Sequence, residues 1–147
     1  MKRRQQRRVE AGAMISRQAM TFTVLYPGSA ASSNSYAPGG RRGMHMPADT
    51  VVFKESVTWM AKAALMVSLW IPKPSDRIKV TVQGRFPNHV HSDVSNLIKY
   101  VADGIEDALN ARAQGKDVFN DRDWQVEALA PQYDPGQAHL VVTLEKE

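Results

Sequence analysis

The sequence contains no cysteine among its 147 residues. This absence excludes a disulfide-stapled secreted scaffold, a zinc finger and a thiol nucleophile. Long apolar runs are also missing, because the longest uncharged one, residues 63–72, is shorter than the roughly 20 residues that span a bilayer. Arg17 and Gln18 interrupt the apolar residues that follow the basic N-terminus, so a signal peptide is not expected. We therefore expect a cytoplasmic protein.

Basic residues are unevenly distributed. Residues 1–20 hold six basic residues and one acidic residue, a net charge of +5, whereas the rest of the chain carries −1. We expect residues 1–19 to form a basic flexible tail that contacts phosphates and residues 20–147 to form one folded domain. A solvated extension, or translation that begins at Met14 or Met20, explains the same composition equally well. The high overall basicity therefore says little about the folded part.

Hydrophobic periodicity predicts the order β-α-β-α-β-β. Strands are expected in four segments: residues 21–26, 78–83, 126–130 and 139–144. Helices are expected in two segments: residues 47–69 and 94–109. The second helix has the clearest pattern, because its apolar residues form one continuous stripe. This order is typical of a small α+β domain in which a mixed sheet packs against two main helices.

The second predicted helix has a polar face opposite its apolar stripe. Asn96, Lys99 and Asp103 lie three and four residues apart, so they are expected to share that face. Asp93 and Ser95 stand at the helix start, where backbone N–H groups favour a carboxylate or a phosphate. Capping alone explains Asp93 or Ser95, and a surface ion pair explains Lys99 with Asp103. Taken one at a time, these residues fit a structural role better than a functional one.

A second acidic cluster precedes the third predicted strand. Asp121 and Asp123 stand in the last turn before it, and the fold can bring them beside the helix start that carries Asp93. Three oxygen-bearing side chains from two elements suit Mg²⁺, which prefers hard oxygen ligands and keeps some of its waters. An ordinary acidic turn is the alternative, and such turns are common.

The two motifs together resemble the RusA family of Holliday junction resolvases. The family pattern is D-x-D-N-x-x-K-x-x-x-D-x-L, followed after a short loop by D-D-x-Q-V. The chain has, in the same order, Asp93-x-Ser95-Asn96-x-x-Lys99-x-x-x-Asp103 and Asp121-x-Asp123-x-Gln125-Val126. The resemblance covers residues 20–145 and includes the order of the strands and helices, so it implies a RusA-like fold.

The resemblance implies a role for each matching residue. Asp93 matches the first metal-binding carboxylate, and Asp123 matches the metal-binding carboxylate nearest the Gln-Val pair. Lys99 matches the catalytic lysine, so Asp93, Lys99 and Asp123 are the expected catalytic residues. Asn96 and Asp103 match the other conserved positions of the family's helix and are expected to support the site.

The chain departs from the family pattern at three places. Ser95 replaces the usual second carboxylate, Arg122 stands where the acidic pair usually begins, and the loop 110–120 is longer. Serine supplies only a neutral oxygen, so the site loses one negative charge unless Asp121 restores it. The expected ligands of Mg²⁺ are Asp93, Ser95, Asp121 and Asp123.

The resemblance implies paired nicks in opposing strands of branched DNA, a four-way junction, during recombination and repair. Two symmetric cuts require two active sites and hence a C2 homodimer. Carboxylate-bound Mg²⁺ lowers the pKa of its water and polarises the phosphoryl oxygen, and Lys99 adds positive charge where negative charge develops. Such a protein is expected to be nucleoid-associated or phage-encoded. Phosphate contacts are expected from the tail and from seven basic residues: Arg41, Arg42, Arg85, Lys99, Arg112, Lys116 and Arg122.

Two other functions remain open. Ser95 in place of a carboxylate favours a protein of the same fold that binds branched DNA without cutting it. A small α+β protein whose basic tail binds nucleic acid nonspecifically is the third alternative.

Overall fold

The structure is a computed structural model that describes residues 18–28 and 48–146. Most of the predicted tail, residues 1–17, lies outside the described residues. So does the stretch 29–47, which includes Arg41 and Arg42. The expectations for the tail and for these two arginines therefore stay predictions.

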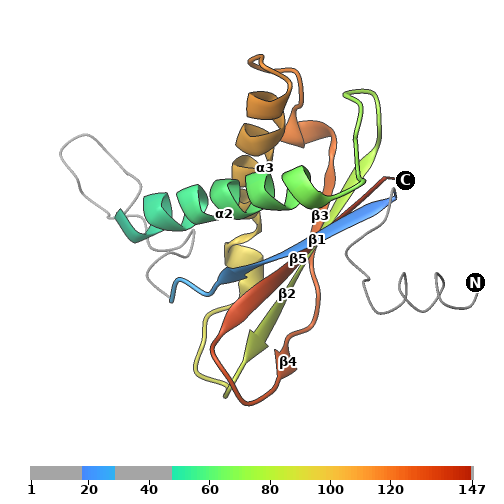
Figure 1. Cartoon of the computed structure of the whole chain (residues 1–147). Coiled ribbons are helices and arrows are strands. Elements are labelled where there is room, and N and C mark those ends of the chain that lie inside the picture. The colour runs from blue at the N-terminus through green and yellow to red at the C-terminus, as the bar shows by residue number, and fades with distance from the viewer. Residues whose placement is uncertain (1–17, 29–47, 147) are drawn as a thin grey trace, which may run out of the picture.

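The described residues form a mixed sheet with two main helices (Figure 1). The sheet order is β1-β5-β2-β3, with β5 antiparallel to both β1 and β2 and β3 parallel to β2. Its strands are β1 (Ala19–Leu25), β2 (Ile78–Phe86), β3 (Gln125–Ala128) and β5 (His139–Lys146). All four predicted strands are confirmed, and no end shifts by more than three residues.

A fifth strand, β4 (Gln132–Tyr133), pairs parallel with the end of β2. The sequence analysis predicted no strand at this position. Two residues are too few to show an alternating pattern, so β4 owes its pairing to the long β2 strand beside it.

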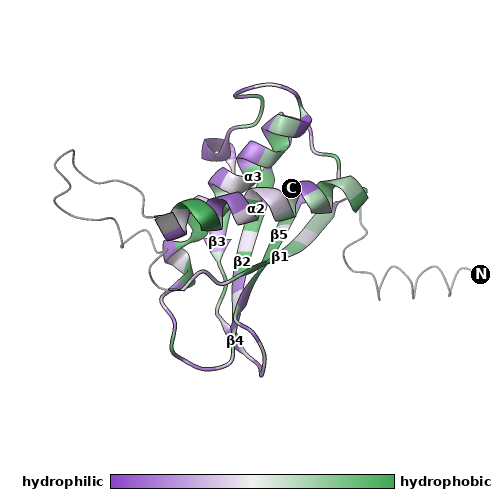
Figure 2. Ribbon diagram, turned by 60° about the vertical axis from the view of Figure 1, so that its left-hand side comes forward, coloured by the Kyte–Doolittle hydropathy of each residue, from purple (hydrophilic) through white to green (hydrophobic). Residues whose placement is uncertain are grey.

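The two helices, α2 (Ala48–Val67) and α3 (Ile98–Arg112), pack on the apolar face of the sheet (Figures 1 and 2). β2 shows why one face is apolar, because its residues alternate strictly between buried and half-buried. The inward residues of the strands share one core with both helices, for example Val80 with Val57 and Ile105. The other face is polar and includes the Thr21 and Thr143 hydroxyls, 3.3 Å apart.

The helices cross closely at Gly104 of α3. A Cβ atom at this position would lie 2.7 Å from Cγ1 of Val57 and 3.1 Å from the backbone oxygen of Lys54. The Thr58 hydroxyl of α2 also donates a hydrogen bond of 3.1 Å to the Gly104 carbonyl. Gly104 therefore permits the approach that fixes α2 across α3, and the helical propensity lost at glycine is offset by this packing.

The second helix begins later than its apolar stripe indicated. Residues Val94–Asn96 form a separate 3₁₀ turn, η3, and α3 starts only at Ile98. Leu97 joins the two with φ −108° and ψ −15°, still within the right-handed helical region. Asn96 lies on η3, whereas Lys99 and Asp103 lie on α3. No helix in the two described ranges has both the length and the apolarity needed to cross a bilayer.

Candidate functional site

One face of α3 carries charged side chains. Lys99, Asp103 and Glu106 lie four and three residues apart, which places them on the same side of the helix. The neighbouring positions Tyr100 and Ile105 are buried in the core, whereas these three side chains are exposed or half-buried. The apolar stripe therefore orients the charged face outward.

The loop after α3 is held against the helix, and this returns the acidic turn to the charged face. Asn110 of α3 accepts a hydrogen bond of 2.7 Å from the Phe119 N–H and donates one of 3.2 Å to the Phe119 carbonyl. The Phe119 ring is buried. The next residues, Asp121–Asp123, form a second 3₁₀ turn, η4, directly before β3.

η4 is attached to α3 by a hydrogen bond from Asp121. The Asp121 N–H donates to Oε2 of Glu106 over 2.7 Å. The side chain of Asp121 lies close enough to Asp103 for their carboxyl groups to share a hydrogen bond, and it also feels the charge of Lys99. Residues from two distant segments of the sequence thus meet at one place.

The carboxyl groups of this cluster are crowded. Partial burial raises the pKa of Asp121, and the hydrogen bond and negative charge of Asp103 raise it further, while a hydrogen bond with the Glu106 side chain and the charge of Lys99 lower it in part. Partial burial also raises the pKa of Glu106, with further contributions from the charges of Asp121 and Asp107. The cluster therefore concentrates more negative charge than its surroundings favour, and a cation there would relieve the repulsion.

Lys99 is not engaged in the surface ion pair that the sequence allowed. Among the described residues, its ammonium group forms no ion pair with Asp103. The residue is exposed, and its charge acts on the carboxyl group of Asp121. The ion pair that would have explained Lys99 as a structural residue is therefore not formed.

Asp93 occupies a different environment at η3. Its Oδ1 accepts a hydrogen bond of 3.0 Å from the Ser95 N–H, which confirms the predicted cap. This bond lowers the pKa of Asp93, and the Ser95 side chain and the charge of His91 lower it further. Asp93 and Ser95 are both exposed, so the carboxylate is charged and open to solvent.

Aromatic side chains hold the segment that leads into Asp93. The Tyr26 hydroxyl accepts a hydrogen bond of 3.0 Å from the Ser92 N–H and lies 2.9 Å from the Ser92 hydroxyl. The His91 ring stacks on Phe86, with centroids 3.8 Å apart. Its Nε2 also lies 2.8 Å from the Tyr133 hydroxyl. These contacts fix η3 at the end of β2.

The remaining predicted site residues have surroundings of their own. Asp123 is exposed at the end of η4. Arg122 is held by Asn120, whose Oδ1 accepts 3.1 Å hydrogen bonds from the Arg122 N–H and Nε. Arg85 alternates with the buried Phe86 on β2, so it lies on the face of the sheet that the helices do not cover.

The predicted four-residue ligand set of Asp93, Ser95, Asp121 and Asp123 is not assembled as one metal-binding group. Within residues 18–28 and 48–146, no three side chains of His, Cys, Asp or Glu form a group arranged to hold a metal ion. Of the predicted site residues on α3 and η4, Asp103 and Asp121 lie next to each other, and the charge of Lys99 acts on Asp121.

Glu106 is the residue that the sequence analysis missed. Its spacing from Lys99 and Asp103 continues the same helical face, so the signal was present. It lies outside the family pattern, and its bond to the Asp121 backbone depends on how the loop returns. No protein-family model matches the chain, and no curated protein matches it either.

Proposed function

We propose that the chain is a RusA-like, Mg²⁺-dependent endonuclease that nicks four-way DNA junctions. The observation that supports this proposal best is the meeting of Lys99, Asp103 and Asp121 on the outer face of α3. These residues come from the two motifs that carry the family resemblance. A resolvase that makes two symmetric cuts acts as a C2 dimer, so the proposal includes homodimerisation.

The donor set suits Mg²⁺ better than a softer metal. Mg²⁺ is commonly held by one or two carboxylates together with substrate phosphates and water. Asp103 and Asp121 supply two adjacent carboxylates, and Glu106 fixes the backbone of Asp121. Asp93 and Asp123 add exposed carboxylates on η3 and η4, which both contact α3. When bound, the ion would polarise the scissile phosphate and acidify a water.

The residues of the chain contribute orientation and charge. Lys99 brings an exposed ammonium group beside the carboxylate pair, where it can stabilise negative charge that develops on a phosphoryl oxygen. Asp93 presents its carboxylate in one orientation, because the Ser95 N–H holds Oδ1. Arg122 stands beside Asp121 and can contact a neighbouring phosphate.

The test is a nicking assay on synthetic four-way junctions with Mg²⁺. The wild-type chain should cut opposing strands in pairs, whereas Asp121→Asn and Lys99→Ala should each lose about 100-fold in rate, since each removes charge at the reacting phosphate. Asp107→Asn is the matched control, because it removes a carboxylate of α3 that pairs with Lys54 and lies outside the cluster. Equal rates in all variants, or no cutting by the wild type, would refute the proposal.

A junction-binding protein without nuclease activity is the second candidate. Ser95 favours it, because the side chain that replaces a carboxylate is exposed and interacts with Asp93 instead of adding negative charge. Binding of junction DNA that is insensitive to Mg²⁺, with no nicking, would support this function. Ser95→Asp separates the two, since nicking that rises in this variant identifies the missing carboxylate as the limit.

A further inference from the structure

α2 carries an exposed apolar stripe on the side that faces away from the core. Val52, Trp59 and Met66 are spaced seven residues apart and are 61%, 74% and 86% exposed. Two small residues, Ser56 and Ala63, lie between them, so the stripe repeats at alternating intervals of four and three. The opposite side of the same helix, with Phe53, Val57, Ala61 and Leu65, is buried in the core.

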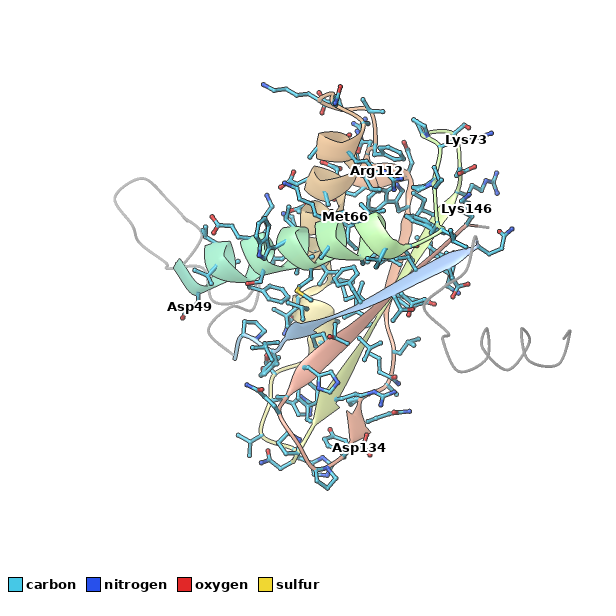
Figure 3. All side chains as sticks on the ribbon, in the orientation of Figure 1. Asp49, Met66, Lys73, Arg112, Asp134 and Lys146 are labelled. Atoms are coloured by element: carbon cyan, nitrogen blue, oxygen red, sulfur yellow. The ribbon has the colours of Figure 1, made fainter. Side chains whose placement is uncertain are left out.

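This arrangement makes α2 apolar on two sides. Figure 2 shows apolar colouring at both ends of the helix, and Figure 3 shows α2 crossing in front of α3 with Met66 on it. A helix that covers a sheet of its own domain needs only one apolar side. The second side is therefore unexplained by packing among residues 18–28 and 48–146.

The spacing of the stripe indicates what covers it. Apolar residues at alternating intervals of three and four form the seam along which one helix packs against another. From Val52 to Met66 the seam extends for about 21 Å at 1.5 Å per residue. We propose that the occupant is α2 of a second copy of this chain, packed antiparallel across a two-fold axis near Thr58.

The antiparallel arrangement is self-complementary in size. An axis near Thr58 sets Trp59 opposite the partner's Ser56 and Val52 opposite the partner's Ala63, so these two large side chains each meet a small one. Trp59 also stands between two hollows of the described surface, of about 750 and 700 Å³. Both hollows are lined in part by Val52 and Ser56. A neighbouring helix can thus insert its ridge beside Trp59.

The arrangement is also complementary in charge. Glu55 and Lys62 flank the stripe and are both exposed, and neither takes part in an ion pair among the described residues. They are seven residues apart, so they cannot pair within one helix. The same axis sets Glu55 opposite the partner's Lys62, and the two-fold symmetry forms this pair twice. A parallel arrangement would instead stack Trp59 on the partner's Trp59 and leave both charges unpaired.

The inference rests on the homodimer of the proposed function and deepens it by naming the interface and its orientation, and a dimer that nicks junctions but resists Trp59→Glu would overturn the inference alone. It is tested by sedimentation equilibrium of the full chain. The wild type should sediment as a dimer. Glu55→Lys and Lys62→Glu should each raise the dimer dissociation constant about tenfold or more, because each sets like charges opposite one another twice.

The double variant with both substitutions decides the orientation. It restores opposite charges across the axis, so its dissociation constant should return to about threefold of the wild-type value or less. Lys116→Glu and Asp134→Lys are matched controls at exposed positions away from α2, and they should leave the dimer unchanged. Circular dichroism of every variant confirms that it is folded.

Trp59→Glu gives an independent readout, since it places a charge at the centre of the seam and should yield a monomer. A wild-type monomer at high concentration overturns the proposal. A dimer that resists Trp59→Glu overturns it as well. Single charge reversals that weaken the dimer without rescue in the double variant overturn the antiparallel arrangement.

Discussion

The two 3₁₀ turns beside α3 hold their aspartates in opposite environments. Asp93 at η3 is exposed, and a local hydrogen bond from Ser95 lowers its pKa. Asp121 in η4 is half-buried against Asp103, and its pKa is raised. The pKa of an aspartate in these turns therefore depends on the groups that pack against it.

The difference also concerns how the turns are built. η3 is capped by Asp93 itself, and its cap depends on a contact two residues along the chain. η4 has an equivalent local cap from Asn120 and, in addition, is held by contacts across the loop, from Asn110 to Phe119 and from Glu106 to Asp121. Removing one contact should therefore lower the free energy of unfolding by a small amount at η3 and by a large amount at η4.

The largest effect is expected from Phe119→Ala. This substitution removes a buried ring and leaves a cavity under the loop that returns η4 to α3, so the free energy of unfolding should fall by about 3 kcal/mol. Urea denaturation followed by circular dichroism measures the change. Val118→Ala, at the more exposed neighbouring position, is the control and should cost less than about 1 kcal/mol. Equal losses in the two variants would contradict the proposed anchoring of η4.

A smaller effect is expected at η3. Asp93→Ala removes the cap of the turn and should lower the free energy of unfolding by about 0.5–1 kcal/mol. Asp93→Asn keeps an oxygen that can accept the Ser95 N–H, so its stability should stay close to that of the wild type. Thermal unfolding of the two variants side by side measures the difference. A loss in Asp93→Asn as large as in Asp93→Ala would show that the cap hydrogen bond is not the stabilising contact.

The smallest expected change in stability is an increase, and it comes from Glu106→Gln. Glu106→Gln keeps an oxygen for the Asp121 N–H and removes one charge from the crowded cluster, so it should raise stability at neutral pH by less than about 1 kcal/mol. The folded-state pKa of Glu106 lies above its ordinary value, so the folded protein binds more protons in that interval. Wild-type stability therefore falls as pH rises from the ordinary value through the raised one.

The gain from Glu106→Gln should accordingly disappear below the ordinary pKa of a glutamate, where the wild-type side chain is protonated as well. Asp93 has the reverse dependence, because its lowered pKa adds stability that is lost only as pH falls through that lowered value. Denaturation midpoints across the acidic range measure both trends. A gain from Glu106→Gln that persists at low pH would contradict the electrostatic explanation.

Much of the fold could be predicted because its pattern is local. The alternation of Ile78, Val80 and Val82 determines which face of β2 is buried, and the stripe of α3 determines which side of the helix faces the sheet. The break at Leu97 could not be predicted, since 3₁₀ and α turns differ little in their sequence preferences. β4 was missed because its pairing depends on β2 and not on its own two residues.

The site could be predicted only in part, because it depends on how distant segments meet. The sequence indicated that the acidic turn approaches the helix, and the structure brings Asp121 to Asp103 and Glu106 in its middle, while η3 carries Asp93 separately. The length of the loop determines this position, and no local pattern encodes it.

The central claim is that Asp103 and Asp121 form the part of the site that holds the cation. The most direct test is a Mg²⁺ titration followed by ¹³C NMR of the side-chain carboxyl groups. The account predicts that the Asp103 and Asp121 carboxyl resonances shift in a saturable way, that Asp134 in the distant turn does not, and that Asp121→Asn abolishes the shift of Asp103. Carboxyl resonances of Asp103 and Asp121 that shift no more than that of Asp134 would contradict it.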